Sequence, residues 1–341
     1  MSEQALYRKY RPEVFSDLIG QEHIVASLEG ALKNGKLAHA YLFSGGRGTG
    51  KTTSARIIAK ALGTTPSDIY EIDAASNRGI DNIRELRENV GTLPFDSEYK
   101  VYIIDEVHML TKEAFNALLK TLEEPPKHAL FILATTELEK VPETIVSRCQ
   151  TFVFKCPSEA VLKDVIERTA KKEKVSLGAG VSDLIAVLAN GSFRDALGTL
   201  QKVITSAGSK VALSDAEAVT GAPSVTLVRD IIDAIARGAL SDALLLLEKS
   251  RESNISLKTL LELVIHSFRR ILLLKVAPAL AKGEVSALSK EEQEFLITMS
   301  KAQSLHINSN TLITLLDAMK DQKSAYIESL PLELALIKIL G

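Results

Sequence analysis

Eight consecutive residues in the first part of the chain have the composition and spacing of a phosphate-binding loop. They match the pattern G-x-x-x-x-G-K-[ST], and they are Gly45, Gly46, Arg47, Gly48, Thr49, Gly50, Lys51 and Thr52. Glycines let several backbone N–H groups point at one anion. Lys51 can reach the β- and γ-phosphates, and the Thr52 hydroxyl can ligate Mg²⁺. We therefore expect a nucleoside triphosphate site, the alternative being an ordinary glycine turn with a lysine.

Two carboxylates and two hydroxyls follow later apolar runs. Asp105 and Glu106 come directly after residues 101–104, so Asp105 is expected to hold Mg²⁺ and Glu106 to orient and polarise the attacking water. Thr135 and Thr136 directly follow the apolar run at residues 130–134. A hydroxyl at this strand end can contact the γ-phosphate or the lytic water. The alternatives are an ordinary acidic turn and two ordinary strand threonines.

These groups need strands that deliver them to one edge of a sheet. Helical periodicity predicts helices at residues 21–34, 53–62, 80–90 and 111–124, and apolar runs predict strands at 40–43, 70–73, 101–104, 130–134 and 151–154. This alternation through residues 1–156 predicts an α/β domain with a parallel, doubly wound sheet. In such sheets ligands bind at the carboxyl ends of the strands, where the loop, the acids and the threonines lie.

The rest of the chain is almost strand-free and predicts an all-α part. Helices are expected at residues 158–173, 181–189, 193–206, 224–237, 240–252, 256–276, 291–303, 309–322 and 332–340. Because Gly221-Ala222-Pro223 marks a boundary, we expect domains at 1–156, 157–221 and 222–341. Residues 244–247 and 271–274 are apolar nearly all round their helices, which indicates either burial within a domain or a subunit interface.

Composition indicates a globular protein of the cytoplasm. The 341 residues are 46% hydrophobic and 25% charged, with a net charge of −2 that excludes a global basic field. Two cysteines, Cys149 and Cys156, suggest no disulfide framework and cannot make a four-ligand zinc site alone. The first residues lack the apolar stretch of a signal peptide, and we expect no membrane span.

Further motifs stand in the order seen in a known family. They are LYRKYRP at 6–12, GQ at 20–21, the glycine loop, EIDAASN at 71–77, DEVHML at 105–110, LKTLEEPP at 119–126, SRC at 147–149 and GSFRDAL at 191–197. The chain resembles bacterial clamp-loader ATPase subunits, and most of all the gamma/tau subunits of DNA polymerase III. The resemblance is dense from residue 1 to about 221 and weak afterwards.

The resemblance implies an AAA+ P-loop NTPase domain, a small helical lid and a C-terminal helical collar. Subunits of this kind form a hetero-oligomeric, ring-like pentamer that uses ATP and Mg²⁺ to open a sliding clamp and place it on primed DNA. Two other functions stay open at this point. One is another AAA+ remodeller of DNA junctions or proteins, and the other is a clamp-loader scaffold that does not hydrolyse ATP.

The resemblance also assigns roles to single residues. Arg148 would be an arginine finger that reaches a neighbour's ATP, and Arg194 would contact the γ-phosphate of the chain's own ATP. Thr136 would be the sensor at the strand end, and the segment at Arg11 and Pro12 would help to cover the adenine. The nucleotide-binding set also includes Thr53, after the loop. Alternatively, Arg148 makes a surface salt bridge, and Arg194 caps its helix or pairs with Asp195.

The sequence departs from the family in two respects. The usual four-cysteine zinc module is missing between the loop helix and strand 70–73, so we predict no zinc. Tau-type chains continue into further domains, whereas this sequence ends at Gly341, so we expect a gamma-length core, either natural or cut from a longer tau-type chain. The delta prime subunit shares the fold but lacks a working glycine loop, and the intact Lys51 and Thr52 argue against that identity.

DNA and clamp contacts are the least specific predictions. Candidates for phosphate contacts are Asn82, Arg84, Arg87 and Lys112, with solvated helix faces as the alternative. Residues 90–98, with an exposed-looking Leu-Pro-Phe at 93–95, are the candidate clamp contact, with an ordinary loop as the alternative. His108 is expected either to relay the state of a partner to Glu106 or to pack beside the strand.

Overall fold

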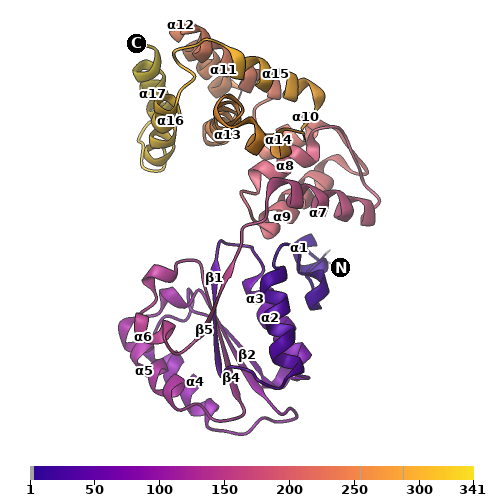
Figure 1. Cartoon of the computed structure of the whole chain (residues 1–341), viewed down its shortest axis with the longest axis vertical. Coiled ribbons are helices and arrows are strands. Elements are labelled where there is room, and N and C mark those ends of the chain that lie inside the picture. The colour runs from indigo at the N-terminus through magenta and orange to yellow at the C-terminus, as the bar shows by residue number, and fades with distance from the viewer. Residues whose placement is uncertain (1–3, 254, 287) are drawn as a thin grey trace. The chain divides into compact units, whose positions relative to one another are not determined.

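The chain folds into two compact units. The computed structural model describes residues 4–253, 255–286 and 288–341 (Figure 1). One unit extends to Val161 and includes Gly191–Asp195, and the other comprises Leu162–Asn190 and Ala196–Gly341. The division into three domains at residues 156 and 221 stays a prediction.

The first unit is built on a five-stranded parallel sheet in the order β2-β3-β4-β1-β5. Its strands are β1 (Ala40–Gly45), β2 (Ile69–Asp73), β3 (Lys100–Asp105), β4 (Ala129–Thr135) and β5 (Gln150–Phe154). The three central strands are apolar along almost their whole length because both of their faces are buried. The predicted parallel sheet with flanking helices is confirmed, and all five predicted strands are present.

Helices cover both faces of this sheet (Figure 1). One layer contains α2 (Glu22–Lys33) and α3 (Lys51–Ala61), and the other contains α4 (Ile80–Val90), α5 (Lys112–Glu123) and α6 (Glu143–Val146). Successive side chains of a strand point to opposite faces, so Tyr41 and Phe43 join the first layer while Leu42 joins the second. Shorter elements are α1 (Leu6–Lys9), η1 (Phe15–Asp17), η2 (Pro66–Asp68), η3 (Val107–Met109) and η4 (Leu138–Lys140).

The second unit is almost entirely helical. Its helices are α7 (Glu159–Lys172, whose first residues belong to the first unit), α8 (Val181–Leu188), α9 (Phe193–Ala207, which begins in the first unit), α10 (Leu213–Thr220), α11 (Val225–Arg237), α12 (Leu240–Glu252), α13 (Leu257–Val276), α14 (Pro278–Ser286), α15 (Lys290–Lys301), α16 (Ser309–Asp321) and α17 (Leu330–Leu340). Two short strands, β6 (Ser176–Leu177) and β7 (Lys210–Val211), pair in parallel. Every helix predicted after residue 157 overlaps one of these helices.

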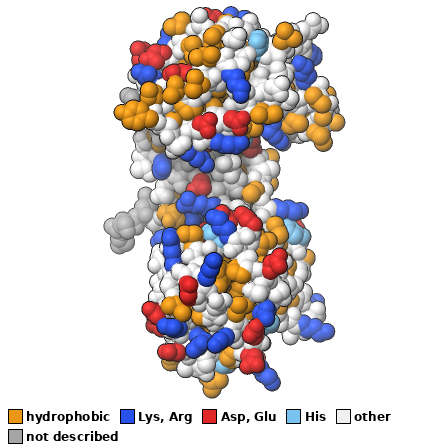
Figure 2. Space-filling model, turned by 90° about the vertical axis from the view of Figure 1, so that its left-hand side faces the viewer, with side chains coloured by type: hydrophobic (Ala, Val, Ile, Leu, Met, Phe, Trp, Pro, Cys, Tyr) orange, Lys and Arg blue, Asp and Glu red, His pale blue; other side chains and the backbone are white. Residues whose placement is uncertain are grey.

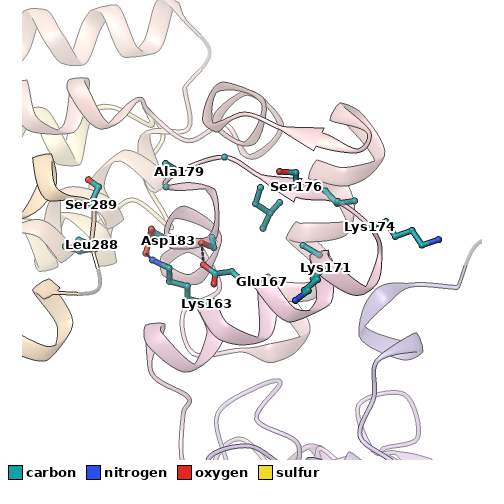
Figure 3. Close-up of a pocket in the computed structure, with 15 residues that line it drawn as sticks. Lys163, Glu167, Lys171, Lys174, Ser176, Ala179, Asp183, Leu288 and Ser289 are labelled. Carbon is teal, nitrogen blue, oxygen red and sulfur yellow. Dashed lines mark hydrogen bonds and ion pairs between the residues drawn. The ribbon is translucent and has the colours of Figure 1, made fainter.

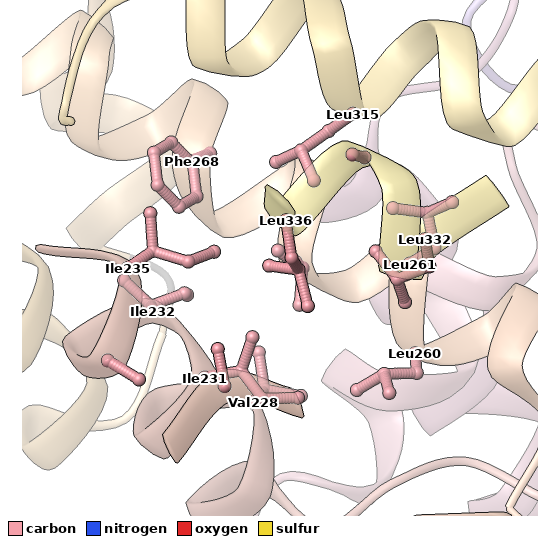
Figure 4. Packing of buried hydrophobic residues seen from close by; sticks show 14 of the residues in the cluster. Val228, Ile231, Ile232, Ile235, Leu260, Leu261, Phe268, Leu315, Leu332 and Leu336 are labelled. Carbon is pink, nitrogen blue, oxygen red and sulfur yellow. The ribbon is translucent and has the colours of Figure 1, made fainter. Parts of the chain in front are cut away.

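Within the second unit, α10 and α14 were not predicted from the sequence. Helix α14 begins with Pro278. Proline usually indicates the end of a helix, although the first helical position tolerates it. The core of the C-terminal helices is a single hydrophobic cluster, and Figure 4 shows side chains from α11, α13, α16 and α17 converging in it. The apolar residues 244–247 of α12 are not all buried, because Leu247 lies in this cluster whereas Leu245 is 61% exposed.

The surface carries charges of both signs, interspersed with apolar side chains (Figure 2). This mixture agrees with the net charge of −2. Among the described helices, none combines the length and the hydropathy that crossing a membrane requires.

Candidate functional site

The glycine loop connects the end of β1 to the start of α3 and needs its glycines for steric reasons. Gly45, Gly48 and Gly50 have φ values of +150°, +69° and +106°, a range that side chains with a Cβ rarely adopt. A Cβ at Gly45 would also lie 2.6 Å from the Phe154 carbonyl oxygen on β5. The loop is therefore wound tightly onto the N-terminus of α3, an arrangement suited to a phosphate group.

Lys51 is the buried cation of this loop. Its side chain is almost fully enclosed, and its Nζ donates hydrogen bonds to the carbonyl oxygens of Gly45 and Gly46, both at 2.8 Å. Burial lowers the pKa of Lys51, while the nearby carboxylates of Glu106 and Asp105 act in the opposite direction. An ammonium group held by carbonyl oxygens can exchange these contacts for phosphate oxygens.

Thr52 and Asp105 meet beside the loop. The Thr52 hydroxyl donates a hydrogen bond of 2.6 Å to Oδ2 of Asp105, which ends β3. A hydroxyl and a carboxylate are the oxygen ligands that Mg²⁺ takes in phosphate sites, where the metal keeps several waters and contacts the substrate. The donor set therefore fits a magnesium ion.

Glu106 follows Asp105 in a left-handed conformation, with φ +50°. A positive φ is uncommon for a residue other than glycine and often occurs at functional sites. The Thr136 hydroxyl, just beyond β4, donates to Oε2 of Glu106 at 3.0 Å. The two residues are brought together because β3 and β4 are neighbours in the sheet and end at the same edge.

His108, in η3, lies beside these residues with its side chain 5% exposed. Its Nδ1 is 2.9 Å from the Thr135 hydroxyl, so Thr135 contacts the imidazole while Thr136 contacts Glu106. Its Nε2 is 3.3 Å from Oε1 of Glu137. Glu137 was not predicted as a site residue, and its one signal in the sequence is its position directly after the strand-end threonines.

Arg194 is positioned next to the glycine loop. It is the second residue of α9, and the preceding Phe193 N–H donates to the carbonyl oxygen of Gly48 at 3.1 Å. A Cβ placed on Gly48 would lie 3.3 Å from the Cβ of Arg194. The helix cap comes from Ser192, whose hydroxyl accepts from the Asp195 N–H. Residues far apart in the sequence are thus packed against the loop.

Arg148 lies on a different part of the first unit, after α6. Its guanidinium donates to Glu123 Oε1 at 2.7 Å and to the Thr144 carbonyl oxygen at 2.8 Å. The side chain remains 34% exposed. Within one chain this is the surface salt bridge named as the alternative, so its role toward a neighbouring chain stays a prediction.

The N-terminal residues predicted to cover the adenine line a basic hollow of about 580 Å³ beside α3. The hollow is bounded by Gln4, Arg8, Arg11, Pro12, Glu13, Arg56, Ile57 and Lys60. Burial and the positive charge of Arg56 lower the pKa of Arg11, although Glu71 opposes this effect. The volume of this hollow falls within the range of small-molecule sites.

The candidate DNA contacts lie on exposed positions of neighbouring helices. Arg84 and Arg87 are exposed on α4, Asn82 is half-buried there, and Lys112 begins α5. Arg84 also forms an ion pair with Asp81 at 3.2 Å. Because acidic and basic side chains alternate on α4, these contacts remain predictions.

A second hollow, of about 690 Å³, lies in the second unit (Figure 3). Lys163 and Asp183 form an ion pair of 2.7 Å on its wall, and Ser182 donates to Glu167 at 2.8 Å. These polar groups satisfy one another within the wall of the hollow.

The fold and the site define a class. A parallel sheet with a glycine loop after β1 and paired acids after β3 is the arrangement of P-loop NTPases of the AAA+ type. The structure of the Thermotoga maritima RuvB Holliday junction branch migration motor matches with a TM-score of 0.53 and 24% identity, covering 66% of this chain and 79% of that one. A structure of a point variant of the same protein matches with the same TM-score of 0.53, at 23% identity. These matches establish the fold.

Sequence comparisons identify the family. A family model described as "DNA polymerase III, delta subunit" matches residues 63–158. DNA polymerase III subunit tau of Bacillus subtilis is 45% identical over 301 residues, which are 82% of this chain and 54% of that protein. Subunit tau of Escherichia coli is 35% identical over 88% of this chain and 50% of that protein.

Subunit gamma/tau of Mycoplasma genitalium is 36% identical over 93% of this chain and 58% of that protein. The chain is therefore homologous over most of its length to DNA polymerase III tau and gamma/tau subunits, and it belongs to this family. It spans about half the length of the curated relatives it matches.

Proposed function

We propose that the chain is the ATPase motor portion of a bacterial sliding-clamp loader. ATP binding would close a ring of subunits around an opened clamp, and hydrolysis would release the clamp on primed DNA. The observation that carries the proposal is the meeting of Lys51, Thr52, Asp105 and Glu106 at the edge of one sheet, with a Thr52–Asp105 distance of 2.6 Å. The homology of the chain to tau subunits over 82% of its length supports this proposal.

Each side chain has a physical role in this scheme. Lys51 would transfer its hydrogen bonds from loop carbonyls to the β- and γ-phosphates, and the N–H groups of the loop would hold the same phosphates. Thr52 and Asp105 would hold Mg²⁺, which when bound neutralises charge on the phosphate oxygens. Glu106 would orient and polarise the attacking water, and Thr136 would hold Glu106 at Oε2.

Two arginines would supply further positive charge. Arg194, packed beside the loop, would contact the γ-phosphate in the same chain. Arg148 is exposed enough to leave Glu123 and enter a neighbour's site, where an arginine finger contributes roughly 10³–10⁵ in rate. The basic hollow at Arg11 and Pro12 would take the adenosine part of ATP.

The proposed partners are other clamp-loader subunits in a pentamer, the sliding clamp and primed DNA, in the cytoplasm and without zinc. Residues 90–98 are proposed as the clamp contact because hydrogen bonds to Asp68 hold the loop after α4 in place. Leu93 and Phe95 are 77% and 76% exposed. The backbone N–H groups of residues 95–97, which precede β3, donate hydrogen bonds to the buried carboxylate of Asp68. Apolar side chains presented by a rigid loop suit insertion into a pocket of a partner.

The test is an ATPase measurement on the chain assembled with its cognate clamp-loader subunits. We expect hydrolysis to rise when clamp and primed DNA are added together. Glu106→Gln should retain ATP binding and lower the stimulated rate by roughly 100-fold or more, because the water loses its orienting base. Glu29→Gln, an exposed change on α2, is the matched control and should leave the rate unchanged.

Two outcomes would contradict the proposal. Absence of stimulation in a verified complex would exclude a clamp-loading motor and favour a remodeller of other substrates. An unchanged rate in Glu106→Gln would favour a scaffold whose nucleotide has only a structural role.

A further inference from the structure

The carboxylate proposed as the catalytic base is the first member of a continuous series of polar side chains. Glu106 Oε2 lies 3.6 Å from Nδ1 of His108, and His108 Nε2 lies 3.3 Å from Oε1 of Glu137. Oε2 of Glu137 is 2.7 Å from Nζ of Lys140, in η4. Glu106 is 32% exposed, His108 5%, Glu137 39% and Lys140 58%, so the series passes through the buried imidazole and ends at the surface.

The imidazole of His108 is fixed in one orientation. The backbone N–H of Glu137 donates to the Thr135 hydroxyl oxygen at 3.0 Å, and that oxygen is 2.9 Å from Nδ1. Thr135 is fully buried at the end of β4, so it cannot move independently of the sheet. Each ring nitrogen is consequently held next to one carboxylate, from Glu106 on one side and from Glu137 on the other.

The contacts of Glu106 are concentrated on one oxygen. Thr136 donates to Oε2 at 3.0 Å, and His108 faces the same Oε2. This arrangement leaves Oε1 to accept a hydrogen bond from the attacking water. A base that acts on a water must be held within hydrogen-bond reach, and small displacements of such a group are costly in rate.

We propose that His108 is a positioning residue for Glu106, and that Glu137 couples this position to the segment that carries Arg148. Glu137 follows Thr136 directly, and η4 and α6 lead from it to Arg148. A shift of this segment when a neighbouring subunit engages Arg148 would pull on His108 through Glu137. The proposal rests on the proposed ATPase function and adds a route by which subunit contact sets the geometry of the base.

The first test separates hydrolysis from binding. His108→Ala in the assembled complex should lower kcat by about tenfold, because Glu106 Oε2 loses the imidazole packed 3.6 Å away and keeps the Thr136 hydrogen bond alone among its described side-chain contacts. The dissociation constant for a fluorescent ATP analogue should change less than about twofold, since the described polar contacts of His108 are with Glu106, Thr135 and Glu137 and not with the glycine loop. His108→Gln keeps a side-chain N–H donor and should recover part of the lost rate.

A matched histidine controls for the loss of an imidazole. His128 is half-buried directly before β4, and its Nε2 is 3.0 Å from the Val90 carbonyl oxygen, at the opposite end of that strand from His108's contacts. His128→Gln should leave kcat unchanged. Thermal unfolding of each variant shows whether it is folded, and His108→Gln carries the test if His108→Ala is not.

The coupling is tested with a double-mutant cycle. Glu137→Gln should lower kcat by a smaller factor than His108→Ala, because it affects Glu106 only through the imidazole. The double variant His108→Ala with Glu137→Gln should be no slower than His108→Ala alone, since removing the ring breaks the connection. A purely structural contribution of the two residues would instead give multiplicative losses and parallel losses in melting temperature.

The outcomes distinguish the inference from the function on which it rests. Stimulated hydrolysis by the wild type together with a normal kcat in folded His108→Ala would overturn the role of His108. Multiplicative losses in the cycle would overturn the coupling through Glu137. A wild-type complex that binds ATP but never hydrolyses it would overturn the proposed function and, with it, the inference.

Discussion

Lys51 illustrates how this chain keeps a cation inside a tightly wound loop. Both carbonyl contacts of its ammonium group come from its own loop, at 2.8 Å, and burial lowers its pKa. The two carboxylates of Asp105 and Glu106 compensate part of that burial. Lys51 is therefore held inside the loop, where its ammonium group can also reach a bound phosphate. Its removal should weaken ATP binding more than the removal of a surface lysine would.

Lys51→Ala should weaken ATP binding by roughly 10- to 100-fold, the equivalent of losing a charged hydrogen bond of about 1.5–3 kcal/mol. Titration of the chain with a fluorescent ATP analogue measures this change. Lys33→Ala, an exposed substitution at the end of α2, serves as the control and should bind normally. Equal affinities for the two variants would remove Lys51 from the phosphate site.

At the scale of elements, η2 acts as the support of a loop that is distant in sequence. Asp68 ends η2 and is fully buried, and its carboxylate accepts hydrogen bonds from the backbone N–H groups of Phe95, Asp96 and Ser97 at 2.7, 3.0 and 3.0 Å. Burial opposes the ionisation of Asp68, but these hydrogen bonds outweigh it and lower its pKa to about 2. The loop at residues 95–97 is thus held in place by the buried charge of Asp68.

Asp68→Asn should destabilise the fold by roughly 2 kcal/mol at pH 7, because an amide replaces the charged acceptor. The native pKa of about 2 lies below the ordinary value of 3.8. The stabilisation is therefore complete above about pH 4 and is lost as the pH falls toward 2. Chemical denaturation at pH 7 and at about pH 2.5 should show the difference between wild type and variant shrinking at the lower pH.

The exposed neighbour Asp96 supplies the comparison for this experiment. Asp96→Asn should leave the stability nearly unchanged at both pH values. A difference between wild type and Asp68→Asn that stays constant from pH 7 to pH 2.5 would contradict the buried-carboxylate account.

At the scale of the whole molecule, one proposed catalytic group makes its described contacts outside the chain's own site. Arg148 pairs with Glu123 at 2.7 Å, whereas Lys51, Thr52, Asp105, Glu106 and Arg194 gather at the glycine loop. If Arg148 acts on a neighbour, each site is shared between two subunits. Hydrolysis then depends on assembly.

Mixing two inactive variants tests this sharing. Complexes made only with Lys51→Ala or only with Arg148→Ala should hydrolyse ATP slowly. Co-assembled chains should recover part of the rate, since an intact finger from one variant can serve an intact loop on the other. No recovery in complexes shown to contain both variants would contradict a role of Arg148 in trans.

Local patterns in the sequence were sufficient for most of the elements and indicated a site for phosphate chemistry. The glycine loop, the acids after an apolar run and the alternation of strands with helices depend on residues close together in the chain, so periodicity and spacing report them. The parallel sheet and the helical remainder were predicted correctly on this basis. The helix at Pro278–Ser286 was missed because a proline at its start resembles a stop signal.

Which of these groups touch depends on the tertiary structure. The strand order β2-β3-β4-β1-β5 inserts β4 between the strands that carry the loop and the acids, and periodicity does not encode such non-local pairing. That order brings Thr136 to Glu106 and aligns His108 with Thr135 and Glu137. The order of residues along the chain was enough to indicate a nucleoside triphosphate site. The pairing of β3 with β4 determined how Glu106, the proposed base, is held, because hydrogen bonds form between neighbours in space.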